Sequence, residues 1–264
     1  MNARKVSSLF QKKINWYIEI FLVLLYKEWV VKYKRTILGF IWSLLYPLLL
    51  AGVFYIAFKS AFKIPIKNYS LFLLPGVFVW QWFSNTLYTG VWSFIETAAL
   101  IKKLPIPKWI IPLTKTTLDL IHFLLAVPIL IFFFLFQGYP IYLFNFTVGF
   151  LALLLLQLLF NFSLALIFGL LNVFFRDIER LVNILLNFLI FITPIFYSLK
   201  NVEEPLVNII LLNPLTYFVI AWRHLFLGEL SFKEVIIISI ITITFLGIAN
   251  FIYKLFANKI PENL

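Results

Sequence analysis

Hydrophobic residues run along this chain in long blocks separated by short clusters of charge. The longest block, residues 120–175, contains 56 residues without one charged side chain. A lone charge in a membrane interior costs roughly 2.5 kcal/mol or more, and one helical pass needs about 20 apolar residues. The block is therefore long enough for two passes. Turn residues near its middle, Gln137-Gly138-Tyr139-Pro140, predict a short uncharged loop between them.

Similar uncharged windows predict six membrane spans in an all-α protein with a single transmembrane domain, residues 1–264. The predicted spans are approximately residues 37–58, 71–95, 113–136, 141–172, 181–199 and 234–254. Residues 205–222 are also uncharged, but Asn208 and Asn213-Pro214 interrupt them. Because proline disfavours helix at the residue before it, we expect a re-entrant or outer-surface helical hairpin here, before the last span.

The first 36 residues carry too many charges to span a membrane. Apolar residues nevertheless recur there at helical spacing, and lysine and arginine flank them. These apolar residues are Trp16, Tyr17, Ile20, Phe21, Leu24 and Leu25. The pattern predicts an interfacial helix on the membrane surface, with its cations near anionic lipid. Plain basic flanking sequence is the alternative.

Composition supports a membrane protein and excludes several other classes. Of the 264 residues, 63% are hydrophobic and 12% charged, and the mean hydropathy is +1.00. The net charge of +11 does not indicate a nucleic-acid partner, because the basic residues gather beside apolar segments. Cysteine is absent, which excludes disulfides and thiolate metal sites.

The distribution of positive charge predicts the orientation. With six spans, 16 Lys and Arg residues fall on the side of both termini and 6 on the other side. Cytoplasmic loops carry the excess of positive charge. Both termini are therefore predicted to be cytoplasmic, in a multi-pass protein of a bacterial or archaeal inner (plasma) membrane.

Catalytic signatures are nearly absent from the sequence. Asp119 and His122, three residues apart, predict a hydrogen-bonded pair near the membrane edge, and we assign no catalytic or metal-binding residue. A phosphate-binding loop of the GxxxxGK[ST] type is missing. No charged residue lies at the centre of a predicted span, which disfavours an ion-coupled carrier.

Stripes of polar or small residues, uncharged within the spans, follow four of the predicted spans at helical spacing, and the fifth-span stripe begins with two arginines just before the span. The first span carries Thr36, Gly39, Ser43 and Tyr46, and the fifth carries Arg176, Arg180, Asn183, Asn187, Pro194 and Ser198. The second carries Gln81, Asn85, Tyr88 and Trp92, and the fourth Gln157, Asn161, Ala165, Gly169 and Asn172. Such residues either hold helices together in lipid or line a path for a polar substrate. We favour the path for the first and fifth spans: Thr36, Gly39, Ser43, Tyr46, Asn183, Asn187 and Ser198.

Two charged segments on the predicted cytoplasmic side are either docking surfaces or ordinary solvated loops. Residues 97–111 include Lys102, Lys103 and Lys108. Residues 174–181 place Arg176, Asp177, Glu179 and Arg180 in a short, densely charged stretch.

Several motifs together resemble the type-2 ABC transporter permeases that export cell-surface polysaccharides such as O-antigen or teichoic acid. The motifs are Lys34-Arg35-Thr36-Ile37-Leu38-Gly39, Pro75-Gly76, Lys103-Leu104-Pro105, Phe175-Arg176-Asp177, Thr193-Pro194-Ile195 and Asn213-Pro214-Leu215 followed by Arg223. The resemblance covers nearly the whole chain, although the family more often has Phe-Pro where this chain has Leu104-Pro105.

The resemblance implies a second copy of the chain and two separate ATP-binding cassette subunits, which bind ATP and Mg, with no cofactor in this chain. It implies ATPase contacts at the two charged segments, and a lipid-phosphate gate at Lys34 and Arg35 for a lipid-linked glycan. Two alternatives remain at this point. They are an exporter of a smaller lipid or drug and a membrane enzyme acting on lipid-linked sugars.

Overall fold

The computed structural model describes residues 3–34, 39, 41–61, 66, 68–139 and 143–264, and every regular element in these ranges is helical. The elements are α1 (Ala3–Tyr33), α2 (Ile41–Phe54), the π-helix η1 (Tyr55–Ala61), α3 (Tyr69–Glu96), α4 (Ala98–Lys103), α5 (Ile110–Phe136), α6 (Leu143–Phe174), α7 (Ile178–Ile192), the short 3-10 helix η2 (Leu199–Asn201), α8 (Leu206–Leu211), α9 (Pro214–Leu227), α10 (Phe232–Phe256), the 3-10 turn η3 (Ala257–Lys259) and α11 (Ile260–Asn263). The all-α prediction is confirmed for this part of the chain.

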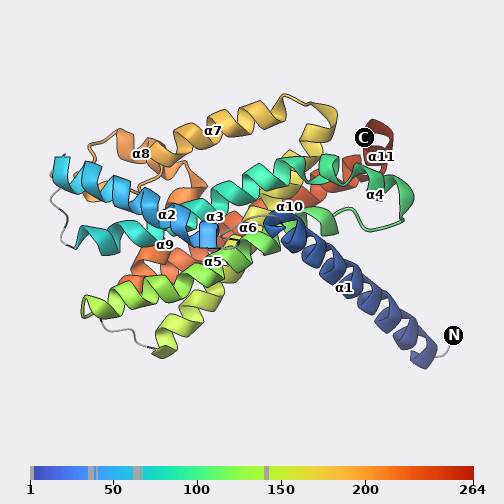
Figure 1. Ribbon diagram of the computed structural model, residues 1–264, viewed down its shortest axis with the longest axis horizontal. Helices are drawn as coiled ribbons and strands as arrows, with labels where there is room; N and C mark the ends of the chain where they lie inside the picture. Colours follow the sequence, from blue (N-terminus) through green and yellow to red (C-terminus); the bar gives the residue numbers. More distant parts are fainter. Residues whose placement is uncertain (1–2, 35–38, 40, 62–65, 67, 140–142) are drawn as a thin grey trace.

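The long helices run back and forth between two ends of one bundle (Figure 1). At one end, the C-terminal parts of α6 and α10 pack with α4 and α11 around Ile101, Val173 and Ile260. We call this the α4 end. At the other end, Gln137 after α5 donates a hydrogen bond to Ser70 at the start of α3, and α8 lies there as well. We call this the α8 end.

Three helices in the described ranges are long and apolar enough to cross a membrane. They cover Ile110–Phe136, Asn145–Phe174 and Phe232–Asn263. α3 has 28 residues but carries more polar side chains, and α7 has only 15 residues. α7 ends at Ile192 because Thr193 is extended and precedes Pro194. The predicted fifth-span stripe is therefore wrong at its far end, since Pro194 and Ser198 lie beyond the helix.

α1 projects away from the bundle toward its N-terminus (Figure 1). Its second half packs on α5 and the α4 end through Tyr17, which contacts Trp109, through Ile20, and through the buried Leu24. Part of the apolar face that the sequence assigned to lipid thus packs on protein. From residue 14 onward, where side-chain exposure is described, the large apolar residues that α1 leaves exposed are Ile14, Trp16, Ile18, Leu22, Val23, Tyr26 and Val31.

α3 and α6 cross at very short range because the crossing residues are small. A Cβ atom on Gly90 would lie 2.6 Å from Cβ of Ala165, and a Cβ atom on Gly169 would lie 2.7 Å from the carbonyl oxygen of Gly90. Close backbone approach through small residues is how helices associate in lipid. For the α6 stripe, the structure thus supports the packing interpretation.

Two amides of the same stripe, Gln157 and Asn172, hold α6 to its neighbours, whereas the buried Asn161 amide makes no hydrogen bond within the described chain. Asn172 donates a 3.0 Å hydrogen bond to the carbonyl of Val91, and Gln157 lies between the carbonyl of Val79 and the indole N–H of Trp222. Both amides are buried. They join α3, α6 and α9 in the interior of the bundle.

We predict that Gly90→Ala destabilises the protein by about 1–3 kcal/mol, because the added methyl group overpacks the crossing and the backbone of α6 must move. Gly247→Ala is the matched control, since a Cβ atom on this helical glycine of α10 meets nothing within 4 Å. Unfolding of the two purified variants in SDS or by heat measures the difference. Equal stability of both variants would contradict a tight α3–α6 contact.

Candidate functional site: a polar groove along α2, α3 and α7

Polar side chains gather in a groove that runs along α3 between α2 and α7. Its first part is a pocket of about 520 Å³ lined by residues of α1, α2, α3 and α5. The lining residues are Lys32, Tyr33, Gly39, Trp42, Ser43, Tyr46, Pro47, Gln81, Asn85, Tyr88, Thr89 and His122. A second hollow of about 290 Å³ shares Tyr46, Gln81, Asn85 and Tyr88 with it and continues to α7 at Leu186, Asn187 and Ile190. We call the two together the polar groove.

α3 supplies the floor of the polar groove. Gln81, Asn85 and Tyr88 lie on one face of this helix, and the side-chain amide of Gln81 donates a 2.7 Å hydrogen bond to that of Asn85. Sequence analysis found this stripe but did not assign it to the substrate path. The α3 stripe and the packing stripe on α6 have the same helical spacing, and only the exposure of their side chains distinguishes them. The amides of α6 are buried, whereas Gln81 and Asn85 are half-buried and Tyr88 is exposed.

The structure brings several of the predicted path residues together. Gly39, Ser43 and Tyr46 line the first pocket, and Asn187 lines the second hollow. Asn183 is half-buried on α7, one turn from Asn187, but does not line either hollow. Ser198 lies outside the groove and caps η2 by accepting a hydrogen bond from the Lys200 amide. Thr36 lies outside the described residues.

A buried carboxylate ties α1 to α3 and α5 beside the groove. Asp119 is 2% exposed, accepts a 3.0 Å hydrogen bond from Thr89 of α3, and lies 3.3 Å from the Lys32 ammonium of α1. His122 lies 3.6 Å from Asp119 and also contacts Tyr33 and Lys32. The predicted Asp119–His122 pair is thus part of a larger network, which we call the Asp119 network.

A second ion cluster fastens the same helices closer to the α4 end. The Lys115 ammonium contacts Glu96 at the end of α3 and lies 3.6 Å from Glu28 of α1. Lys115 is buried, and its two carboxylate partners are only partly covered. Breaking a buried pair by removing one partner is costly, so these contacts fix where the second half of α1 lies.

The predicted phosphate gate falls at the end of α1. Lys34 is exposed and continues the helix through a hydrogen bond from its amide to the carbonyl of Val30. Arg35 lies outside the described residues. Lys32, which sequence analysis counted only as flanking charge, is the cation that the described chain places at the groove.

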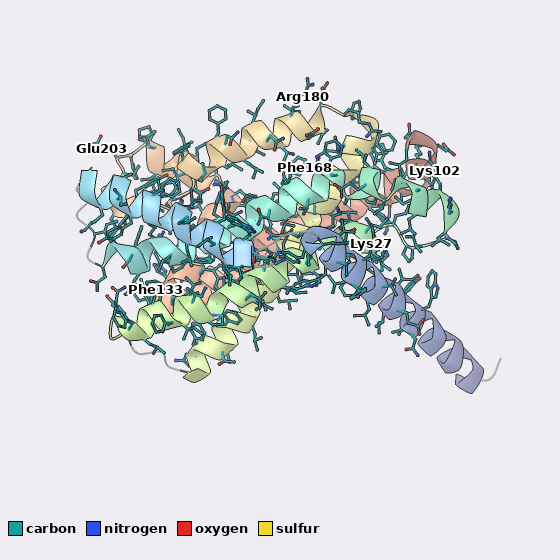
Figure 2. The ribbon with its side chains drawn as sticks, in the orientation of Figure 1. Lys27, Lys102, Phe133, Phe168, Arg180 and Glu203 are labelled. Atoms are coloured by element: carbon teal, nitrogen blue, oxygen red, sulfur yellow. The ribbon has the colours of Figure 1, made fainter. Side chains whose placement is uncertain are left out.

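The predicted docking residues all lie at the α4 end. Lys102 and Lys103 are exposed on α4, and Arg176, Asp177 and Arg180 are exposed at the turn between α6 and α7, with Glu179 half-buried beside them. The residues form two separate groups, one on α4 and one at the start of α7, and Figure 2 labels one residue of each, Lys102 and Arg180. Among the described residues, no ion pair or hydrogen bond joins the two groups.

Lys108 differs from the other docking residues because it is tied to the bundle. Its ammonium donates a 2.6 Å hydrogen bond to the carbonyl of Ala257, and burial lowers the pKa of this lysine. The side chain therefore holds the loop after α4 against the end of α10, and it is less available than Lys102 or Lys103 for a partner.

Long apolar helices around a polar groove define a multi-pass membrane protein of the permease class. The family model for ABC-2 type transporters matches residues 19–227. The chain belongs to this family. It is thus a membrane-embedded transport subunit that works with a separate ABC ATP-binding partner, and the family resemblance found in the sequence is confirmed.

Known relatives match along most of the chain. An O-antigen export system permease protein RfbA of Klebsiella pneumoniae is 35% identical over 241 residues, covering 90% of this chain and 93% of the relative. A protein of the same name from Myxococcus xanthus is 26% identical over 218 residues, covering 81% of this chain and 83% of the relative.

We predict that Asp119→Leu loosens α1, because Lys32 and Thr89 lose their shared acceptor. Backbone amides of residues 20–33 should then exchange with deuterium about tenfold faster, the result of a local stability loss near 1.4 kcal/mol. Lys27→Met is the control, because the Lys27 side chain is exposed and the ion pairs of exposed side chains contribute little. Unchanged exchange in Asp119→Leu would show that the Asp119 network is not needed to hold α1, and that its apolar contacts and the Lys115–Glu28 pair are sufficient.

Proposed function

We propose that this chain is the permease subunit of an ATP-driven exporter that moves a lipid-linked polysaccharide of O-antigen or teichoic-acid type across the inner membrane. The polar groove is the observation that carries the proposal. It offers amides, hydroxyls and aromatic faces in a helical bundle that exposes many large apolar side chains elsewhere. The names of the relatives support a polysaccharide as the cargo.

The chemistry of the groove fits a sugar polymer. Gln81, Asn85 and Asn187 supply neutral donors and acceptors for hydroxyl groups, and Trp42, Tyr46 and Tyr88 supply aromatic faces for sugar rings. A hydrogen bond between a neutral amide and a hydroxyl group is weaker than an ion pair. A polymer can therefore move along such a lining in steps.

A second copy of the chain closes the groove in this proposal. Asn187, Tyr46 and Tyr88 are exposed in the single chain, and an amide facing hydrocarbon without a partner is costly. The exposed apolar residues beside them, such as Leu49 and Val53 of α2 and Ile184 and Phe188 of α7, suit contact with another helix or with lipid. Two grooves facing each other form one conduit shielded from lipid.

The proposed topology has six passes with both termini in the cytoplasm. The passes are α2 with η1, α3, α5, α6, α7 and α10, and α8 with α9 forms a re-entrant hairpin from the α8 end. A helix of 15 residues is about 22 Å long, so the chain after Ile192 completes the fifth pass. The excess of basic residues near the α4 end supports this orientation.

The α4 end then faces the ATP-binding partners, which bind ATP and Mg. Arg176, Asp177, Glu179 and Arg180 lie where α7, a wall of the groove, begins. A movement of this turn caused by the ATP-binding partner would be transmitted to the groove through α7. In this proposal Lys32 and Lys34, with Arg35 next in the sequence, bind the phosphate of the lipid carrier as it enters the groove beside α1.

Ser43→Trp should block export of the polymer, because an indole at this position fills the first pocket, and Asn85→Leu should reduce export by removing an amide from the floor. Surface polymer measured by lectin or antibody binding in intact cells reports both effects. The control is Ile243→Trp, at an exposed position of α10 away from the groove. Normal export by both groove variants would assign the stripe to helix packing.

Asp177→Lys with Glu179→Lys should abolish export while the permease still folds, because reversing two charges at the turn before α7 repels a complementary partner surface. Co-purification with the ATP-binding subunit and polymer export are measured together. Glu203→Lys is the matched control at the opposite end of the molecule (Figure 2). Retained partner binding in the double variant would place the docking surface elsewhere.

A further inference from the structure

Arg223 is a buried cation to which neither the groove nor the docking surface assigns a role. It lies on α9, is 5% exposed, and takes part in no ion pair among the described residues. Its guanidinium lies over the ring of Phe72, 3.5 Å from the centroid. A charged side chain inside a membrane protein is costly and usually functional, so its contacts show what it does.

Arg223 binds main-chain carbonyls of two distant segments at once. Nε donates a 2.9 Å hydrogen bond to the carbonyl of Phe72 on α3, and Nη2 donates to the carbonyls of Pro194 at 3.0 Å and Ile195 at 3.3 Å. The rigid planar fork of arginine suits this arrangement, whereas lysine is a point donor on a flexible stem. One side chain of α9 therefore fastens the chain after α7 to the start of α3.

Other side chains complete the same attachment. Tyr69 donates a 2.9 Å hydrogen bond to the carbonyl of Phe196, and the Asn213 amide donates a 2.8 Å hydrogen bond to the hydroxyl of Thr193. We call Arg223, Tyr69 and Asn213, with their acceptors in residues 193–196 and at Phe72, the Arg223 clamp. Residues 193–196 are buried, so carbonyls released by the end of the helix depend on these donors.

Gly76 leaves the room that the clamp needs. A Cβ atom there would lie 3.3 Å from Nη2 of Arg223 and 3.4 Å from Cγ2 of Ile195. Three separated motifs of the sequence, Pro75-Gly76, Thr193-Pro194-Ile195 and Asn213-Pro214 with Arg223, thus meet at one point.

The clamp is the main polar attachment of α7. Among the described residues, no side chain of Ile178–Ile192 makes a hydrogen bond or ion pair with another helix. At the α4 end α7 begins in exposed chain, and its only buried residue is Val182. The far end of this groove wall is therefore held by hydrogen bonds, and the rest by apolar contacts.

We propose that Arg223 is a positioning residue for transport: it fixes the α8 end of α7 against α3 and so sets the shape of the polar groove. The inference rests on the proposed function, because the groove must be the substrate path. The hydrogen bonds and the ring contact of Arg223 in the described chain are with Phe72, Pro194 and Ile195, none of which lines the groove.

Spin-label distances test this role, and the absence of native cysteine makes the labels unique. One pair, Ile192→Cys with Ile236→Cys, reports the α8 end, and a second pair, Leu181→Cys with Leu255→Cys, reports the α4 end. All four positions are exposed. Each pair is measured in lipid nanodiscs in the full-length chain and in its Arg223→Met, Arg223→Lys and Gly76→Ala variants.

In Arg223→Met, the distance distribution at the α8 end should shift or broaden by about 5 Å, one helical turn, while the α4-end pair keeps its distribution. Arg223→Lys and Gly76→Ala should give smaller changes of the same kind, and they decide the outcome if Arg223→Met does not fold. Thr216→Val is the control, since this buried threonine of α9 bonds only to the nearby Ile210 carbonyl. Unchanged α8-end distances, or equal broadening of both pairs, would overturn the proposal.

Polymer export by the same variants separates the two proposals. We expect export to fall in the order of the distance changes while binding of the ATP-binding subunit is kept. If the distances change and export does not, the clamp is only structural and the inference is wrong, while the groove still stands on the Ser43 and Asn85 variants. If those groove variants also export normally, the proposed function fails first.

Discussion

Polar groups in this protein must find partners inside the bundle, because lipid offers none. This constraint explains most of its side-chain chemistry. Gln157 and Asn172 bond to carbonyls of α3, Asp119 gathers a lysine, a threonine and a histidine, and Arg223 satisfies carbonyls released where α7 ends. A few buried atoms, such as both amide atoms of Asn161 on α6, make no hydrogen bond in the described part of the chain, whereas in the polar groove amides of α3 and α7 remain open to a ligand. That contrast is what marks the groove as a place for a polar cargo.

The bundle also divides into a tightly joined part and a loosely joined part. α3 and α6 touch backbone to backbone at Gly90 and Gly169, and aromatic rings such as Phe160 and Phe218 fill the layer beneath them. α2 and α7, which form the walls of the groove, bury far fewer side chains. A transport cycle that moves the walls against a fixed floor is consistent with this distribution.

Sequence reasoning predicted the features that follow from charge and helical period. The uncharged block at residues 120–175 predicted α5, α6 and the turn between them, and the spacing of Ser43, Tyr46 and Asn187 pointed to the groove. Sequence reasoning failed where the exposure of a side chain depends on which other helix packs against that face of its own helix. Gln81 and Gln157 look alike along the chain, yet one is open and the other is buried. Likewise, spacing alone extended the α7 stripe to Ser198, because it ignored the effect of Pro194 on the preceding residue.

The Asp119 network links α1 to the floor of the polar groove through one carboxylate. Lys32 ends a rod that projects from the bundle, and Thr89 lies on the groove floor. If a change in bilayer thickness or leaflet composition tilted α1, Lys32 and Asp119 would connect that tilt to Thr89 at the polar groove. The composition of the surrounding lipid would then change the transport rate independently of nucleotide.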